Sequence, residues 1–558
     1  MSRLPETEAV QVDVKAFTRN AGIMATGTIV SRLTGFLRYA SLAYVLGLTL
    51  QFGKTNLPST YSLANSLPNM IFDLIIGGVL SSLFIPVFVE YLSSKGEKEA
   101  WFVASAVTNI SLILLGAVTV LGIFISPLII RLMTVFGSYS SGDVTTQVVR
   151  DQASFFLRFF MPQIIFYGLA AIFTGLLNSH KHFTVPAFAP TVNNLAVVAT
   201  VIIFHFLPGP RDNNLHLAVL GVGTTVGVAL QALVQIPPLI KRGVRYTLTL
   251  ALRHPAVRKI GRLAIPLLGY ILLWQISTWF VFALAIKKDG GVPSYQYAQM
   301  FFQLPYGIFA VSVITALFPT LSEQAAFRHM DEYKRTLSLG IRATALVIVP
   351  AFVGYVLLAQ PIIRLLLQHG FFKAGDTDVL TSVLLFFSLG LVPYSIDMLL
   401  TKGFYALQDT RTPMIINCFV VAVNIGANYL FFRLMGIKGL ALGFSTAYLF
   451  SMALDWTVLR KRIGGMGGRR IADSFLRIAL SAGLMALLVF GVSWALDRSA
   501  ATGIGMDLLR VFLPLLLGGA VYFVAASALK TPEMQMVRSL ATSVRARLKD
   551  AGRARNRG

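Results

Sequence analysis

The stretch Gly22–Leu48 reads GIMATGTIVSRLTGFLRYASLAYVLGL, and two of its residues, Arg32 and Arg38, are charged. An apolar run of about 20 residues is long enough to cross a bilayer as a helix. A charge inside such a run is costly and usually has a function. The segment therefore predicts a membrane helix whose arginines meet an anionic ligand.

Thirteen comparable segments follow along the chain of 558 residues, which is 55% hydrophobic and 13% charged. A soluble protein would carry about 25% charged residues. The composition predicts an all-α polytopic membrane protein with about 14 transmembrane helices. The expected spans are 22–48, 59–88, 101–126, 153–178, 186–206, 217–240, 263–286, 294–321, 337–359, 379–406, 414–432, 437–459, 474–496 and 508–529.

The positive charges favour one side of the membrane. The net charge is +24, and 30 of the 48 lysines and arginines fall in the two termini and the alternate loops on their side. Cytoplasmic loops of membrane proteins are enriched in lysine and arginine. We therefore expect a cytoplasmic N-terminus at 1–21 without a cleavable signal peptide, a basic cytoplasmic linker at 241–262 and a basic cytoplasmic tail at 530–558.

Two parts of the sequence resemble each other at an offset of about 230 residues. The string ANSLP at Ala64–Pro68 precedes Ile85–Pro86, and FFQLP at Phe301–Pro305 precedes Phe318–Pro319. Asparagines follow later in both parts, at 193 and 194 and again at 424 and 428.

An even number of spans in each repeat predicts two parallel six-helix lobes around a central cavity. We place the N-lobe at 22–240, the C-lobe at 263–459 and an appended helix pair at 474–529. Rocking of such lobes gives alternating access, which favours a transporter over an enzyme or a scaffold.

The two arginines of the first span suit a phosphate-bearing substrate. Arginine stays ionised, and its planar group binds phosphate oxygens bidentately. Arg32 and Arg38 are six residues apart, about 240° around a helix, so they cannot share one narrow face. The alternative is that they snorkel toward the interface as structural residues.

Other polar residues lie inside expected spans. Asp73 follows Asn69 and is predicted to pair with an arginine of the first span, in either a structural or a functional role. Asp397, five residues before Lys402, is a candidate ligand for a coupling ion. Asn417 and Asn424 are expected to bridge helices or to contribute to the same ion site.

No catalytic constellation is apparent. The seven histidines are scattered without metal-ligand spacing, and the single cysteine, Cys418, lies in an apolar segment. No Walker A sequence is present. We expect neither an enzyme, nor a cofactor, nor a metal site, nor a nucleic-acid partner.

Three strings resemble one known family. SRLTGFLR at Ser31–Arg38, FQLPYGIFAVSVITALFPTLS at Phe302–Ser322 and GFYALQDTRTP at Gly403–Pro413 are similar to motifs of the MurJ/MviN family, the lipid II flippases of the MOP exporter superfamily. The similarity extends over about residues 16–530. LPNM at Leu67–Met70 and the second string resemble the actinobacterial branch in particular.

The resemblance implies a two-lobe fold around a cationic cavity, with Arg32 and Arg38 binding the pyrophosphate of lipid II and the 474–529 pair holding its polyprenyl tail. It implies a multi-pass protein of the bacterial cytoplasmic membrane that uses a monovalent cation or the membrane potential. Candidates for ion pairs or for the cavity lining are Asn69, Asp73, Gln299 and Gln303.

The sequence departs from the family pattern at several positions. Phe72 and Asp73 stand where many members have arginines. Gln299 stands where many members have an aspartate, and Ser59 or a neighbour stands in place of an acidic residue. Two alternatives therefore stay open. One is a flippase for another polyprenyl-pyrophosphate glycan, and the other is a drug or cation antiporter of the same superfamily, which would favour an acidic cavity.

Overall fold

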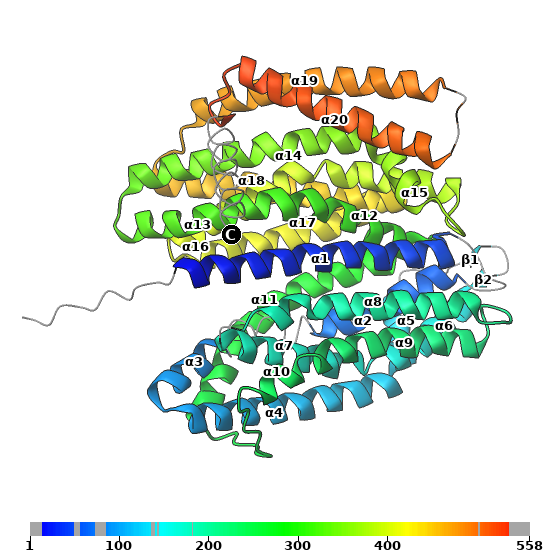
Figure 1. Cartoon of the computed structure of the whole chain (residues 1–558), viewed down its shortest axis with the longest axis vertical. Coiled ribbons are helices and arrows are strands. Elements are labelled where there is room, and N and C mark those ends of the chain that lie inside the picture. Colours follow the sequence, from blue (N-terminus) through cyan, green and yellow to red (C-terminus); the bar gives the residue numbers. More distant parts are fainter. Residues whose placement is uncertain are drawn as a thin grey trace, which may run out of the picture. The chain divides into compact units, whose positions relative to one another are not determined.

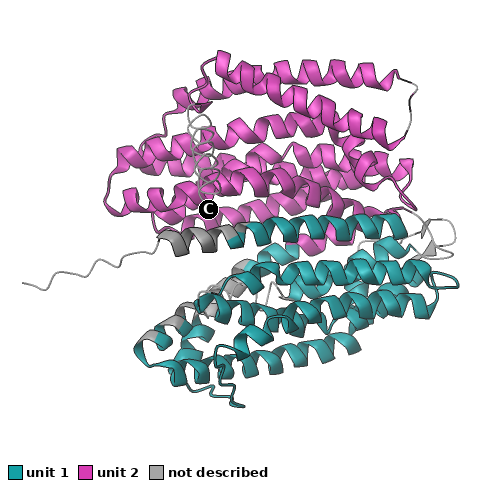
Figure 2. Cartoon of the chain, in the orientation of Figure 1, with its two compact units in different colours: residues 1–46, 50–276 teal, residues 47–49, 277–558 magenta. Residues whose placement is uncertain are grey.

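The computed structural model describes residues 14–49, 56–72, 85–135, 140–141, 144–180, 182–499, 501 and 503–534. The chain divides into two compact units, coloured separately in Figure 2: residues 1–46 with 50–276, and residues 47–49 with 277–558. The division falls inside one long helix, α11, which runs from Pro255 to Ala285.

Among its described residues, unit 1 consists of helices and one two-residue ladder, in which β1 (Ser140–Ser141) pairs antiparallel with β2 (Val144–Thr145). Its helices besides the first part of α11 are α1 (Val14–Leu46), α2 (Leu57–Phe72), α3 (Ile85–Ser94), α4 (Glu97–Phe124), α5 (Ser126–Met133), α6 (Thr146–Phe160), α7 (Gln163–Ser179), α8 (Thr184–Phe206), α9 (Asn214–Leu233) and α10 (Ile236–Ile240). Helix α8 packs against both α1 and α9, and α2 packs against α6 (Figure 1).

Unit 2 is helical throughout its described residues and contains one π-helical turn. Its elements after α11 are α12 (Gly291–Pro305), the π-turn η3 (Tyr306–Ala310), α13 (Val311–Ala326), α14 (Met330–Leu367), α15 (Ala374–Ser388), α16 (Leu391–Ala406), α17 (Arg411–Met435), α18 (Ile437–Ile463), α19 (Gly468–Asp497) and α20 (Ile504–Ala528). Helix α17 packs on α18, and α19 packs on both α20 and α14.

The all-α polytopic prediction is confirmed, whereas the count of fourteen spans is not. The described residues contain ten helices that are long and apolar enough to span a membrane, or eleven when α15 and α16, bent by 42°, count as one. These eleven fall on eleven of the expected spans. The other three, 22–48, 59–88 and 263–286, fall on α1, on α2 with α3, and on α11.

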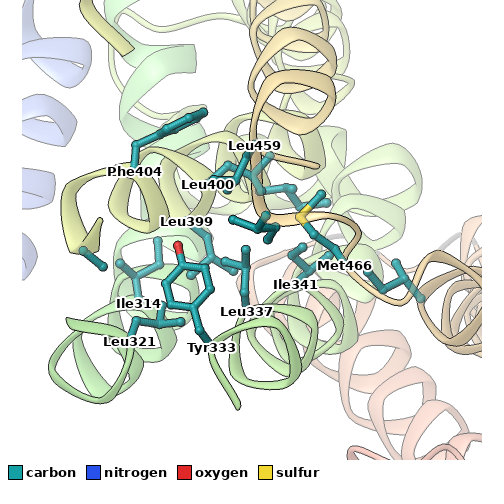
Figure 3. Packing of buried hydrophobic residues seen from close by; sticks show 14 residues of the cluster. Ile314, Leu321, Tyr333, Leu337, Ile341, Leu399, Leu400, Phe404, Leu459 and Met466 are labelled. Carbon is teal, nitrogen blue, oxygen red and sulfur yellow. The ribbon is translucent and has the colours of Figure 1, made fainter. Parts of the chain in front are cut away.

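The cores of unit 2 explain how the last two helices are held. A buried cluster that includes Tyr333, Leu337, Leu399 and Leu459 joins α13, α14, α16 and α18 (Figure 3). A second cluster, with Ile478 and Tyr522 among its members, joins α19 and α20 to α14. Within a bilayer, van der Waals packing of these side chains stabilises the docking of the two helices.

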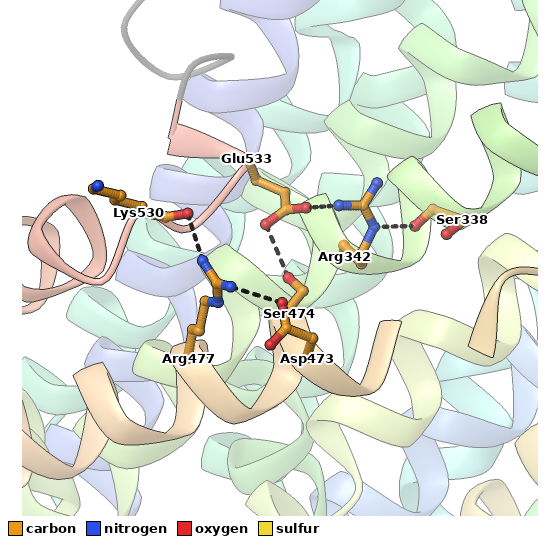
Figure 4. A network of polar contacts seen from close by, with 7 residues as sticks. All are labelled: Ser338, Arg342, Asp473, Ser474, Arg477, Lys530 and Glu533. Carbon is orange, nitrogen blue, oxygen red and sulfur yellow. Dashed lines mark hydrogen bonds and ion pairs between the residues drawn. The ribbon is translucent and has the colours of Figure 1, made fainter. Parts of the chain in front are cut away.

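A polar network fixes the chain where α20 ends (Figure 4). The fully buried Glu533 forms an ion pair with Arg342 of α14 and accepts a 2.8 Å hydrogen bond from Ser474 of α19. Arg477 donates to the carbonyl oxygens of Leu529 and Lys530 at 3.0 and 2.9 Å. The pairing of a buried carboxylate in this way avoids the cost of an isolated buried charge.

Candidate functional site

Arg38 is the centre of a polar group in unit 1. It is half-buried on α1, and the Tyr61 hydroxyl of α2 lies near its guanidinium group. The hydroxyls of Tyr39 and Tyr167 lie close enough to interact electrostatically with it. Its Nε is buried and has no hydrogen-bond partner within the described part of the chain. The guanidinium thus keeps a free donor in a tyrosine-lined setting.

Neighbouring side chains hold these tyrosines in place. The Tyr61 hydroxyl lies 2.9 Å from the Thr224 hydroxyl of α9. Asn69 of α2 lies near the Tyr167 hydroxyl of α7 and donates to the Asn65 carbonyl oxygen at 3.0 Å. The structure therefore brings Asn69 into the group around Arg38, and four helices contribute to it. Sequence reasoning missed the tyrosines, because tyrosine is common in membrane helices.

Arg32 does not join this group. Its side chain is exposed, in line with the 240° separation from Arg38. Helix α1 is positioned between them by Asn194 of α8, whose amide donates to the Ser31 carbonyl oxygen at 3.1 Å and to Thr34 Oγ1 at 3.2 Å. Asp73, the predicted partner of an arginine, lies outside the described residues.

Asp397 lies in a second polar group, in unit 2. It is buried on α16, and its carboxyl group lies beside Ser451 and Asp455 of α18. Asp455 is also buried and accepts a 3.2 Å hydrogen bond from Thr401. One carboxyl oxygen on each aspartate has no hydrogen-bond partner among the described residues. Asp455 was missed by the sequence analysis, although a lone carboxyl group in the span 437–459 was the available signal.

The other predicted ion ligands form a separate group. Asn424 Oδ1 accepts hydrogen bonds from Ser277 of α11 at 2.8 Å and from Asn428 at 2.7 Å. This confirms that Asn424 bridges helices, because Ser277 and Asn424 lie on α11 and α17. The amide nitrogen of Asn417, two turns earlier on α17, has no partner in the described ranges. Lys402 Nζ lies 5.4 and 5.5 Å from the ring centres of Phe318 and Tyr405.

Gln299 and Gln303 lie on α12, where Gln299 is half-buried and Gln303 is exposed. The motif that contains Gln303 continues into η3, directly after Pro305. A π-helical turn inside an α-helix is rare and occurs frequently at functional sites. The sequence analysis did not predict it.

The third motif has a structural role that its residues explain. Asp409 accepts hydrogen bonds from the backbone N–H groups of Arg411 and Thr412, at 3.1 and 3.0 Å, and forms an ion pair with Arg462 at the end of α18. Burial acts to raise the pKa of Asp409, but these hydrogen bonds and the Arg462 charge outweigh it and lower the pKa below its usual value. The motif thus caps α17 and ties it to α18.

No group of three or more potential metal ligands occurs among the described residues. The polar side chains inside the helices include an arginine among tyrosines and a pair of carboxyl groups. Such groups in membrane helices mark pathways for substrates and ions. Together with the helix arrangement, they define the class of this protein as a polytopic membrane transporter.

Known structures have the same fold. A structure titled lipid II flippase MurJ, inward closed conformation, superposes with a TM-score of 0.74 at 24% identity, over 90% of this chain and 98% of that one. An inward-facing multidrug resistance MATE family transporter of the MOP superfamily gives 0.63 at 16% identity, over 77% and 94%. At these identities the likeness shows the fold.

Sequence comparisons give the family. The family model described as lipid II flippase MurJ matches residues 49–512, and the chain belongs to this family. It is 27% identical to the probable lipid II flippase MurJ of Vibrio cholerae, over 87% of this chain and 90% of that protein. It is also 27% identical to the probable lipid II flippase MurJ of Bdellovibrio bacteriovorus, over 96% and 98%.

Proposed function

We propose that this protein moves lipid II from the inner to the outer leaflet of the bacterial cytoplasmic membrane, by alternating access, for cell-wall synthesis. The family model, the curated relatives and a solved structure carry the name lipid II flippase, and the fold is shared with a multidrug resistance MATE family transporter. The single observation of this structure that carries the proposal is Arg38, a half-buried arginine with an unpartnered Nε inside a membrane helix.

The chemistry of the substrate suits that arginine. The pyrophosphate of lipid II carries negative charge, and guanidinium groups bind phosphate oxygens through charge-assisted hydrogen bonds. The hydroxyls of Tyr39, Tyr61 and Tyr167 can donate to further phosphate oxygens, since each lies near Arg38. In this proposal Arg38 binds the pyrophosphate, while the exposed Arg32 attracts it before binding.

The coupling ion is the second part of the proposal. Two buried carboxyl groups in contact, Asp397 and Asp455, cannot both stay ionised without a compensating cation or proton. No lysine or arginine within the described ranges forms an ion pair with either of them. We assign a monovalent cation or a proton to this pair, with Asn417 and Asn424 on the neighbouring α17. Both termini are proposed to be cytoplasmic, as the loop charges favour.

The decisive experiment measures lipid II translocation. Cells depleted of their own flippase express this chain, and the lipid II accessible to an external cleaving enzyme is measured. We expect accessibility to return with the wild-type chain and to fail with Arg38→Ala. The matched control is Arg131→Ala, an exposed arginine of the same unit. Absent accessibility with folded protein in the membrane would contradict lipid II as the substrate, and full rescue by Arg38→Ala would remove the arginine from the mechanism.

A further inference from the structure

A cavity of about 570 Å³ lies wholly within unit 2, away from the polar groups described above. Its walls come from four helices: α14, α15, α19 and α20. Its volume is within the range of small-molecule sites. Near Arg364, at the C-terminal end of α14, the cavity lies between helices α14 and α15 on one side and the α19–α20 pair on the other.

Charged residues lie at one end of the cavity, and the distances between the atoms of their ion pairs are long. Arg364 of α14 lies 3.3 Å from Asp507, and Arg510 of α20 lies 3.4 Å from Asp497 and 3.6 Å from Asp507. Tight charge-assisted hydrogen bonds are about 2.7–2.9 Å long. Arg510 Nε and Asp507 Oδ1 are buried and make no hydrogen bond in the described part of the chain. Arg510 therefore retains a donor for an additional anionic group, and the Arg364 side chain, 41% exposed, is accessible to the same group.

Deeper in the cavity the lining becomes less polar. Thr381 of α15 and Ser493 of α19 line it, and their buried hydroxyl oxygens have no hydrogen-bond partner among the described residues. Hydroxyls in helices normally donate to the carbonyl oxygen one turn earlier, and these do not. Val356, Leu357 and Leu385 complete the lining. Charged, hydroxyl and apolar groups thus line one cavity, and this combination suits an amphiphilic ligand.

The balance of charge selects the headgroup. Two arginines meet three carboxyl groups, those of Asp497, Asp507 and Asp378, and Asp378 is exposed while it accepts a 3.0 Å hydrogen bond from Gln360. A headgroup with a phosphate alone would add negative charge to a site that already carries an excess of it. A headgroup that combines a phosphate with an ammonium group satisfies both the free guanidinium donors and the exposed carboxylate.

We propose that this cavity binds a zwitterionic glycerophospholipid, with its phosphate on Arg364 and Arg510, its ammonium group on Asp378, and the start of an acyl chain against Leu357 and Leu385. The lipid bridges α14 and α15 to the α19–α20 pair. The cavity lining shares no residue with the Arg38 group or with the carboxyl pair, so a failure here is distinguishable from a failure of the proposed function.

The test is native mass spectrometry of the purified full-length protein, with measurement of its thermal midpoint. Four additions are compared: phosphatidylethanolamine, phosphatidylglycerol, glycerophosphoethanolamine and inorganic phosphate. We expect phosphatidylethanolamine to be retained at least tenfold more tightly than phosphatidylglycerol and to raise the midpoint. Arg364→Gln should lose this retention, whereas Arg498→Gln should keep it, because Arg498 stacks on the Trp494 ring outside the cavity lining.

Ser493→Ala is a second variant, chosen because it should not impair folding: it removes a hydroxyl that makes no hydrogen bond in the described structure. We expect it to fold as the wild type does and to bind phosphatidylethanolamine several-fold more weakly. Equal retention of phosphatidylglycerol, equal binding of inorganic phosphate or glycerophosphoethanolamine, or unchanged retention by both Arg364→Gln and Ser493→Ala would each overturn the proposal.

Discussion

The two units share a plan of helices and differ in the charge they place within it. In unit 1 the pair α6 and α7 precedes the closely packed pair α8 and α9. In unit 2, about 230 residues later, α15 and α16 precede α17 and α18 in the same way. Yet the first unit surrounds an arginine with tyrosines, and the second unit buries two aspartates against each other. Backbone plan and chemistry are therefore determined by different residues.

The shared plan is visible in one repeated contact. A side chain at Gly227 of α9 would meet Asn193 Oδ1 of α8 at 2.7 Å, and a side chain at Gly443 of α18 would meet Asn428 Oδ1 of α17 at 2.4 Å. In both units a glycine lets the second helix of the pair approach an asparagine of the first. Small residues allow such approach in membrane helices. Asn193 and Asn428, two of the asparagines that marked the sequence repeat, thus have a packing role.

The largest expected effect comes from replacing Arg38, the arginine that distinguishes unit 1. Arg38→Ala should lower lipid II translocation by roughly 30-fold or more, because truncation of a buried charge partner costs ~2–5 kcal/mol. The translocation rate of Arg38→Lys should lie between the rates of the wild type and of Arg38→Ala, because lysine keeps the charge and loses the planar, bidentate geometry. Initial rates of accessibility, normalised to protein level, measure both. Equal translocation rates for Arg38→Lys and Arg38→Ala would show that the positive charge by itself does not support transport.

The next effect concerns the acidic side. Asp397→Asn should weaken the dependence of transport on the driving cation or on pH by roughly 5- to 150-fold, the usual range of coupling between two sites. Transport in vesicles with imposed ion gradients is the measurement. Thr401→Val serves as control, because it removes the hydroxyl that donates to Asp455 and leaves both carboxyl groups. An unchanged ion dependence in Asp397→Asn would separate this pair from coupling.

A smaller effect tests the repeated glycine contact. Gly443→Ala should destabilise the protein by ~1–3 kcal/mol, the range for overpacked cores. Gly227→Ala should cost less, because at position 443 the added atom also meets the Asn428 backbone nitrogen at 2.9 Å, while at 227 the nearest backbone atom is at 3.1 Å. Thermal midpoints of both variants give the order. A reversed order would mean that the two helix pairs do not use the contact in the same way.

The loops that connect the pairs differ in the strength of their attachment. Asp409→Ala should destabilise unit 2 by about 1 kcal/mol, as for other lost helix caps. Arg242→Ala should have a smaller effect in unit 1, because the exposed side chain is hydrogen-bonded, within the described residues, only to the His180 carbonyl oxygen at 3.0 Å and to His182 Nδ1 at 3.2 Å. Protease sensitivity of the two loops checks the prediction, with cleavage rising more near 409 than near 181.

The smallest effect depends on pH. The pKa of Asp409 is lowered in the folded protein, so its ionised form adds stability above the ordinary carboxyl value of about 3.8, and this is lost as the pH falls through the folded value. Asp409→Asn should therefore show a constant deficit in thermal midpoint between about pH 5 and 8. The deficit should shrink below about pH 3.8. A deficit that grows in acid would contradict the assignment of the charge to Asp409.

Particular residues show how far the sequence could predict the site. Arg38 could be found because one charge in an apolar run is conspicuous, and Asp397 for the same reason. The tyrosines around Arg38, and the pairing of Asp455 with Asp397, could not be predicted, because the spacing of helices in the sequence does not reveal which faces meet. Arg32 and Arg38 were grouped by motif, and the structure separates them, with Arg32 exposed and Arg38 half-buried.

The sequence by itself determined that this is a polytopic helical membrane protein with a repeat and an unusual first span. The reason is physical: long apolar runs have to form helices in a bilayer, where every backbone polar group needs an internal partner. Only the tertiary structure decided that Tyr61 and Tyr167 surround Arg38, that Asp455 meets Asp397, and that a charged cavity separates α14 and α15 from part of α19 and α20. Those arrangements depend on the packing of helix faces distant in sequence, which local hydropathy does not encode.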